Sequence, residues 1–361
     1  MRIFPFILVV LFFILAGSVS SPAQNAASVE PLLLYKAQQD KNCRHWVDSV
    51  MDKLSFKEKV GQLFIYTIAP VNTKRNLELL REAIDTYKVG GLLFSGGKMQ
   101  NQVELTNRAQ RQAKVPVMIT FDGEWGLAMR LRGTPVFPQN MVLGCIRDNR
   151  LIYEYGREVA RQCRQIGVQV NFAPVADVNI NPKNPVINTR SFGEDPIQVA
   201  DKVIAYASGL EGGGVLSVCK HFPGHGDTSE DSHETLPVVR HNRARLDSVE
   251  LLPFKRYIYD GFGGIMTGHL YVPALDKSHK PASFSKAVVT DLLQKELGFQ
   301  GLCFTDALAM KGASTKKTDN PSVKALLAGN DILLAPAAPI NDFTAVKEAI
   351  EEGVLDLEAI E

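Results

Sequence analysis

The sequence predicts an α/β fold, a (β/α)8 barrel of the TIM type, and two features of the chain carry that prediction. Eight short, nearly continuous apolar runs follow one another, separated by longer segments with helical spacing. Ionisable residues stand at the ends of five of these runs. A barrel explains both features, because its parallel strands are covered on both faces and its chemistry lies at their carboxyl ends.

The first segment, residues 1–23, has the pattern of a signal peptide. Arg2 gives it a positive start, residues 3–16 are apolar, and Ser21-Pro22-Ala23 fits a cleavage site. The apolar run falls short of the ~20 residues that span a bilayer as a helix. We therefore expect an exported protein, periplasmic or secreted, with no membrane span after signal removal and a barrel domain in residues 30–361.

The predicted strands come next, after a helical segment over residues 30–54. Each is a run without strict alternation, as expected of a parallel strand buried on both faces. The runs begin at Gly61, Val89, Val115, Val168, Val215, Gly264, Gly301 and Asp331.

Helical spacing marks the segments between the strands, including residues 76–87, 149–167, 196–213 and 286–298. In the third of these, Val199, Val203 and Leu210 share a face, and the glycines at 212–214 predict the end of the helix. A doubly wound open sheet is the alternative architecture. The eight alternations over roughly 290 residues favour the barrel, which needs about 250.

Composition limits the class of protein. Hydrophobic residues make up 45% of the 361 positions and the formal net charge is +1, which suits a soluble globular domain and argues against a nucleic-acid partner. The cysteines are odd in number and scattered, which predicts buried free thiols and no disulfide framework. They are Cys43, Cys145, Cys163, Cys219 and Cys303.

The strand ends supply the candidate chemistry, since the barrel brings them to one rim. The residues there are Asp122, Asp177, Lys220 with His221, His269 and Asp306. Asp306 follows the run GLCFT, where a rigid strand end suits a nucleophilic carboxylate. The alternative for Asp306 is the N-cap of a following helix.

The segment KHFPGHGDTSEDSH, residues 220–233, holds three of the chain's seven histidines. In an extended loop Asp231 and His233 would point the same way, so that the carboxylate orients the imidazole as a general acid. A solvated polar loop is the alternative, because Asp-Ser-His alone is a weak signal. Gly224 and Gly226 flank His225 and predict a sharp turn and a close approach to a ligand.

Two ligand types fit these groups. Five of the polar residues predict a collar suited to a ligand dense in hydroxyls, such as a sugar. They are Asp122, Arg130, Arg190, Lys220 and His221. A metal site is the alternative, with ligands His221, His225, Asp227 and His233, but a strand-end His221 loses the same-face geometry of a helical His-x-x-x-His pair.

These motifs resemble the family 3 glycoside hydrolases, and within them the single-domain β-N-acetylglucosaminidase branch. The matching segments are residues 220–233, Asp122-Gly-Glu-Trp-Gly with Arg130, NTRSFGEDP from Asn188, and FTDALAM around Asp306, and the likeness runs from about residue 45 onward. The histidine segment is specific, because the β-glucosidase branch lacks it.

The resemblance implies a role for each residue. Asp306 matches the nucleophile of a covalent glycosyl-enzyme, and His233 the general acid/base with Asp231 as its partner. Asp122, Arg130, Arg190, Lys220 and His221 match the residues that hold the N-acetylglucosamine ring. The branch retains anomeric configuration and needs no metal or other cofactor. An imidazole acid departs from the usual carboxylate pair of retaining glycosidases.

The implied activity is exo-hydrolysis of terminal β-linked N-acetylglucosamine from cell-wall muropeptides or chitin-derived sugars. Two other functions stay open: a phosphorylase, since a neutral imidazole repels phosphate less than a carboxylate does, and a sugar-binding barrel without turnover. The chain stops at EEGVLDLEAIE, where relatives carry one more barrel-closing helix and some carry a second domain. We therefore expect a fragment that lacks its last closing helix and a downstream domain.

Overall fold

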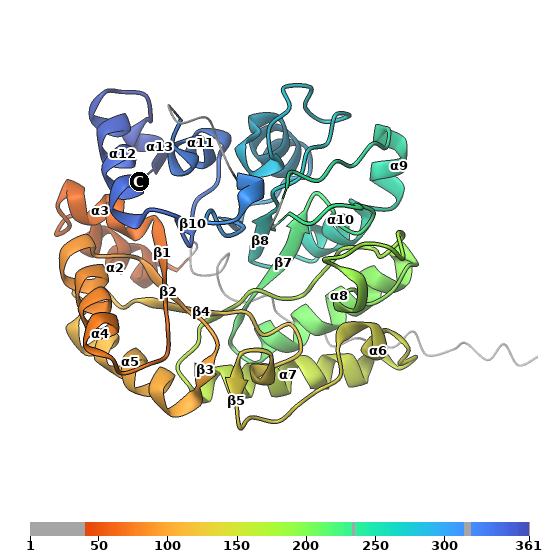
Figure 1. Cartoon of the computed structure of the whole chain (residues 1–361), viewed down its shortest axis with the longest axis horizontal. Helices are drawn as coiled ribbons and strands as arrows, with labels where there is room; N and C mark the ends of the chain where they lie inside the picture. The colour runs from red at the N-terminus through yellow and green to blue at the C-terminus, as the bar shows by residue number, and fades with distance from the viewer. Residues whose placement is uncertain (1–39, 233–234, 314–318, 361) are drawn as a thin grey trace, which may run out of the picture.

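The computed structural model describes residues 40–232, 235–313 and 319–360, and its centre is a barrel of eight parallel strands (Figure 1). Every predicted apolar run contains one of them. The barrel strands are β1 (Phe64–Ile68), β2 (Gly91–Phe94), β4 (Met118–Phe121), β6 (Val170–Asn171), β7 (Leu216–Phe222), β8 (Gly264–Thr267), β9 (Leu302–Thr305) and β10 (Leu333–Leu334). The predicted fold class is confirmed.

The strands follow one another around the barrel in chain order, and the last pairs with the first. The order is β10-β1-β2-β4-β6-β7-β8-β9, with every neighbouring pair parallel. A bridge between Phe304 and Ile332 joins the end of this order to its start, and the Thr305 N–H donates to the Ile332 carbonyl at 3.0 Å. The sheet therefore closes on itself.

Helices surround the strands on the outside (Figure 1). Those that alternate with the barrel strands are α4 (Lys74–Arg81) continued by η1 (Glu82–Tyr87), α5 (Met99–Gln112), α7 (Asn149–Gln165), α8 (Pro196–Gly212), α10 (Leu252–Tyr259), η5 (Ala287–Glu296), α11 (Pro321–Ala328) and α12 (Pro339–Glu351).

Shorter elements lie before the barrel and in its loops. They are α2 (Lys41–Met51), α3 (Phe56–Gln62), β3 (Gly97–Lys98), η2 (Leu127–Met129), β5 (Leu131–Arg132), α6 (Asn140–Gly144), η3 (Asn188–Arg190), α9 (Arg243–Ser248), η4 (Ala282–Phe284), η6 (Lys311–Ala313) and α13 (Leu357–Ile360). β3 and β5 pair with each other beside the barrel mouth.

Helix α8 shows how local sequence sets the element bounds. Its N-cap Asp195 accepts hydrogen bonds from the N–H groups of Ile197 and Gln198, and Pro196 fills the first turn, where no intrahelical donor is needed. The helix ends at the predicted glycines, with Gly214 at φ +82°, a conformation that a side chain disfavours.

The apolar core has two parts, inside and outside the barrel wall. The inner part takes at least one buried side chain from most strands, with Phe172 and Phe304 meeting edge to face at 5.6 Å. The outer part fills the layer between strands and helices, where α7 packs against α8. The interior of the barrel is therefore filled by side chains.

Helix α12 follows the last strand and covers the seam of the barrel. Its Phe343 ring lies 6.0 Å from Phe64 of β1 and 5.2 Å from Tyr87 of η1. A helix therefore closes the eighth β-α unit within the described residues. The expectation of a further helix and domain beyond residue 361 stays a prediction.

Two sequence predictions concern regions away from the barrel mouth. Residues 1–23, the predicted signal peptide, lie outside the described residues. Across the described ranges, no helix has the length and apolar character needed to cross a bilayer. All five cysteines are free, but Cys145 is exposed at the end of α6, so the prediction of buried thiols is wrong for that residue.

Asp331, just before β10, makes stability depend on pH. Its Oδ2 accepts from the Cys303 N–H at 2.7 Å, and burial raises the pKa of this carboxyl to about 6, although that bond opposes the rise. A carboxyl group whose pKa is higher in the folded than in the unfolded protein favours folding while it is protonated. Its contribution to the free energy of unfolding is complete below the unfolded-state pKa and is lost as pH rises through about 6.

We expect Asp331→Asn, which keeps an acceptor oxygen, to remove this loss. Relative to the variant, the wild-type free energy of unfolding should fall by up to about 3 kcal/mol between pH 4 and 7.5, measured by urea denaturation. Asn in place of the exposed Asp85 on η1 is the control and should leave the pH profile unchanged. Parallel profiles for wild type and Asp331→Asn would contradict the prediction.

Candidate active site

The carboxyl ends of the barrel strands surround a cavity of about 430 Å³. Six of the eight residues predicted for the site line it, and they arrive from four loops or strand ends of the barrel. They are Asp122, Arg130, Arg190, Lys220, His221 and Asp306. Apolar side chains, including Met129, Met266 and Met310, complete the wall. The prediction that these residues share one rim is confirmed.

A fully buried carboxylate, Glu124, is at the centre of the polar residues. It accepts two hydrogen bonds from Arg190, at 2.7 Å from Nη2 and 3.0 Å from Nε, and Lys220 Nζ lies 2.9 Å from its Oε1. Glu124 is 0% exposed and Lys220 3% exposed. The two cations therefore replace the water that the carboxylate loses on burial.

Asp122 extends the network toward the rim. Its Oδ1 accepts from Lys220 Nζ at 3.0 Å and its Oδ2 from Arg130 Nη2 at 2.9 Å. Asp122 and Lys220 are 98 residues apart in the sequence, and strands β4 and β7 bring them together at the barrel mouth. The result is a chain of alternating charges from Arg130 through Asp122, Lys220 and Glu124 to Arg190.

The network fixes the charge state of its members. Burial would raise the pKa of Glu124, but Arg190 and Lys220 hold it well below its usual range. For Lys220, burial favours the neutral amine, and Asp122 and Glu124 overcome that effect and raise the pKa. Both groups are therefore ionised across the neutral pH range.

Asp177, buried at 0% exposure after β6, holds the second part of the site. Its Oδ2 accepts from His221 Nδ1–H at 2.7 Å, and its Oδ1 accepts from the His225 backbone N–H at 2.6 Å. The assignment of the proton to Nδ1 follows because a carboxylate only accepts. His221 Nε2 then faces Arg190 Nη2 at 3.4 Å, which connects the two parts.

Asp306 comes directly after β9 and lines the same cavity. Its Oδ1 accepts from the adjacent Ala307 N–H at 2.7 Å, and the next helical turn, η6, begins only at Lys311. The N-cap alternative is therefore excluded. Burial would raise the pKa of Asp306, but the imidazoles of His221 and His269 and the Ala307 bond lower it below its ordinary value.

The histidine segment curls over the cavity, and Ser232 forms part of its lining. His233 lies outside the described residues, so the Asp231–His233 pair stays a prediction. The Thr235 N–H donates to the Asp231 carbonyl at 2.9 Å. The Gly312 N–H donates to the Ser232 carbonyl at 3.0 Å, which anchors the segment to the loop that follows Asp306.

The glycines on either side of His225, Gly224 and Gly226, have different structural roles. Gly224 has φ +126° and makes the predicted turn. A Cβ on Gly226 would lie 1.9 Å from the Val178 carbonyl oxygen, so this glycine permits a close approach to the neighbouring loop. The expected approach of this segment to a ligand stays a prediction.

Three residues of the site lay outside the predicted set: Glu124, Asp177 and His225. Asp177 had the signal of a strand-end carboxylate, and His225 that of a histidine between glycines. Glu124 had little signal, because its partners Arg190 and Lys220 follow it in the sequence only after 66 and 96 residues.

Three of the proposed metal ligands, His221, His225 and Asp227, do not converge, and the fourth, His233, lies outside the described residues. His221 Nδ1 bonds to Asp177, His225 Nδ1 bonds to Thr228, and Asp227 forms a 2.5 Å contact with His241. Across the described ranges, the carboxylate and imidazole groups close enough to share an ion are Asp227, His241 and Glu250. The Arg245 guanidinium already lies 3.2 Å from Glu250 Oε1 there, which supplies the positive charge.

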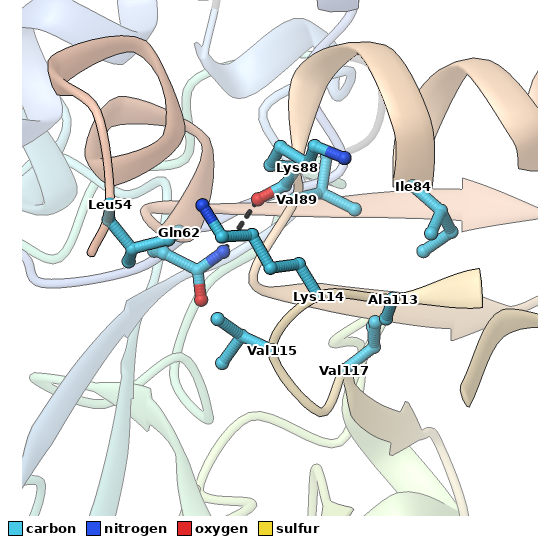
Figure 2. Close-up of a pocket in the computed structure, with 9 residues that line it drawn as sticks. All are labelled: Leu54, Gln62, Ile84, Lys88, Val89, Ala113, Lys114, Val115 and Val117. Carbon is cyan, nitrogen blue, oxygen red and sulfur yellow. Dashed lines mark hydrogen bonds between the residues drawn. The ribbon is translucent and has the colours of Figure 1, made fainter. Parts of the chain in front are cut away.

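A second hollow lies at the other end of the barrel, around the starts of β2 and β4 (Figure 2). Gln62 crosses it and donates to the Lys88 carbonyl at 2.6 Å. Its volume of about 10 Å³ is too small for a sugar, so the cavity at the carboxyl ends is the candidate site.

Comparison with known proteins gives the family. The family model "Glycosyl hydrolase family 3 N terminal domain" matches residues 55–361. The chain belongs to glycoside hydrolase family 3. It is 39% identical over 286 residues to Beta-hexosaminidase A of Pseudoalteromonas piscicida, which covers 72% of this chain and 48% of that protein. It is 32% identical over 330 residues to Beta-hexosaminidase LpqI of Mycobacterium tuberculosis, covering 85% and 80%.

Solved structures of the family agree. A family 3 β-N-acetylglucosaminidase from Paenibacillus sp. str. FPU-7 superposes with a TM-score of 0.80 at 36% identity, covering 85% of this chain and 60% of that one. The chain thus spans about half of the Pseudoalteromonas protein and three fifths of the Paenibacillus one. Its barrel corresponds to the N-terminal domain of family 3, and the two relatives compared above by sequence are named beta-hexosaminidases.

The buried network of this family 3 barrel makes a prediction about stability. Glu124→Gln leaves Arg190 and Lys220 without their shared countercharge. The free energy of unfolding at pH 7, measured by urea denaturation, should therefore fall by about 3–5 kcal/mol. The difference should shrink as pH falls below about 4.5, because a carboxyl with a lowered pKa stabilises only while ionised.

Glu158→Gln is the matched control. Glu158 forms an equally short bond to Arg161, at 2.6 Å, but on the surface of α7. Its loss should change the free energy of unfolding by about 0–1 kcal/mol. Equal effects of the two substitutions would show that burial of the Glu124 cluster is energetically unimportant.

Proposed function

We propose that this barrel is a retaining exo-β-N-acetylglucosaminidase, which hydrolyses terminal β-linked N-acetylglucosamine through a covalent glycosyl-enzyme. The observation that carries the proposal is the placement of Asp306 in one cavity with the Arg130–Asp122–Lys220–Glu124–Arg190 network. Asp306 offers a carboxylate at the end of β9, and the network offers fixed donors and acceptors for sugar hydroxyls. The names of the relatives support the substrate class.

Asp306 suits the role of nucleophile for two reasons. Its lowered pKa keeps the carboxylate ionised at neutral pH, as attack on an anomeric carbon requires. Its Oδ1 is held by the Ala307 N–H, which fixes the direction of the carboxylate on a rigid strand end. Hydrolysis of the resulting ester by water would restore the original anomeric configuration.

The charged network suits the sugar ring. The Lys220 ammonium has three N–H donors. Asp122 and Glu124 take up two of them, and the third serves a sugar hydroxyl. Asp122 and Arg130 offer an acceptor and donors nearer the rim. These groups are held by one another before substrate arrives, so binding costs little side-chain ordering.

Acid catalysis is assigned to His233 with Asp231, on the resemblance of the segment. The anchoring of Ser232 by Gly312 supports this assignment, since it holds Ser232, which directly precedes His233 in the sequence, at the cavity. For the natural substrate we propose cell-wall muropeptides or chitin-derived sugars, and for the location the periplasm or the exterior, because residues 1–23 have the pattern of a signal peptide.

Asp306→Asn tests the nucleophile. An amide keeps the size of the side chain but attacks poorly, so kcat with an aryl β-N-acetylglucosaminide should fall by about 10³-fold or more. The thermal unfolding midpoint should stay near that of the wild type. Asp291→Asn on the exposed face of η5 is the control and should keep full activity. Substantial turnover by Asp306→Asn would rule out the assignment.

Product analysis tests the reaction as a whole. With a muropeptide disaccharide and a chitin disaccharide, NMR spectra recorded at early times should show free N-acetylglucosamine as the β-anomer. Added phosphate should leave the product unchanged, and a chelator should leave the rate unchanged. A sugar 1-phosphate would identify a phosphorylase, loss of rate with chelator would identify a metal hydrolase, and binding without turnover would identify a sugar-binding protein.

A further inference from the structure

His225 lines the cavity together with Asp306 and Lys220, yet the mechanism above gives it no role. It follows β7 by three residues and is 1% exposed. Its ring stands nearly perpendicular to that of His221, with centroids 6.1 Å apart. A buried imidazole at this position calls for an explanation, because polar side chains at the bottom of a cavity are costly unless paired.

The surrounding residues fix His225 on three sides. Its backbone N–H donates to Asp177 at 2.6 Å, and its carbonyl accepts from Asn184 Nδ2 at 2.8 Å. Its ring Nδ1 forms a 2.7 Å hydrogen bond with the Thr228 hydroxyl. The contact of Gly226 with the Val178 carbonyl holds the next residue in place. These bonds hold both the backbone and the ring of His225 in one arrangement.

The second ring nitrogen, Nε2, is buried and has no hydrogen-bond partner among the described residues. Burial lowers the pKa of His225 to about 4, so the imidazole is neutral at neutral pH. A neutral imidazole has one donor and one acceptor nitrogen. With Nδ1 bonded to Thr228, whose hydroxyl serves either as donor or as acceptor, Nε2 supplies the complementary function.

An unpaired buried polar atom costs about 1–3 kcal/mol. In a rigid cavity that cost is recovered when a ligand brings the missing partner. We propose that His225 contacts the substrate, with Nε2 hydrogen-bonded to a polar substituent of the sugar ring, either a hydroxyl or the acetamido group. A hydroxyl both donates and accepts, so it satisfies Nε2 in either tautomer. This inference rests on the proposed function and extends it to a specificity-determining residue.

Asp306, which attacks the anomeric carbon in the proposed mechanism, and His225 line the same cavity. Because a polar site rejects an analogue that lacks the matching group, this residue would help to distinguish one sugar from another.

The test is a cycle of enzyme variants and substrate analogues. Wild type and His225→Leu are assayed with an aryl β-N-acetylglucosaminide, its 3-, 4- and 6-deoxy analogues, and the corresponding glucoside. In the wild type, kcat/KM should fall for each missing group. In His225→Leu, the parent substrate should lose about 10–100-fold, and one of the analogues should suffer no further loss.

Unchanged penalties for every analogue in His225→Leu would overturn the proposal, because a merely structural histidine lowers all rates alike. His45→Leu, on the exposed face of α2, is the matched control and should behave as the wild type. If His225→Leu does not fold, His225→Gln enters the same cycle. A wild type inactive on the parent substrate would instead refute the proposed function.

A structure of the wild-type protein with bound N-acetylglucosamine decides the matter without any variant. The proposal requires a sugar oxygen or nitrogen within about 3.2 Å of Nε2. A sugar seated against Lys220 and Asp122 with no polar atom near Nε2 would refute the contact while leaving the proposed function intact.

Discussion

The buried carboxylate of Glu124 is the constraint on which the rest of the site depends. It has lost all contact with water, and Arg190 and Lys220 are the groups that compensate it. Each of these cations also contacts a further residue of the site: Lys220 donates to Asp122, and Arg190 Nη2 lies 3.4 Å from His221 Nε2. Because Glu124 follows β4, Arg190 follows β6 and Lys220 belongs to β7, the ion cluster also fixes these parts of the barrel relative to one another. The ion cluster that is needed for stability therefore also sets the shape of the cavity.

Asp177 plays the corresponding part on the other side. One carboxylate holds the ring of His221 and the backbone of His225, two residues of the same segment that face the cavity from different directions. This double hold explains how a segment rich in glycine can present defined groups. The glycines make the turn and the close approach possible, and the buried carboxylate selects one conformation from those the glycines allow.

Burying several charged groups costs free energy, which the rest of the fold must offset. Ion clusters inside proteins gain little or nothing over apolar packing of the same volume, because each charge loses its hydration. The filled interior around Phe172 and Phe304, and the layer between strands and helices, supply the stabilisation. Preorganised charges at the mouth of the barrel then act on a bound sugar with little rearrangement during the reaction.

Local sequence determined the strands, most of the helices and the rim on which the chemistry lies, since apolar runs and strand-end polar residues are properties of neighbouring positions. Asp306 could be identified this way, as could Lys220 and His221. The role of Glu124 and the packing of Gly226 against Val178 were decided only by the tertiary structure. The physical reason is distance along the chain: Glu124 and Arg190 are 66 residues apart, and Asp122 and Lys220 are 98 apart. Such pairs carry no local pattern, and only closure of the barrel brings opposite charges within hydrogen-bonding distance.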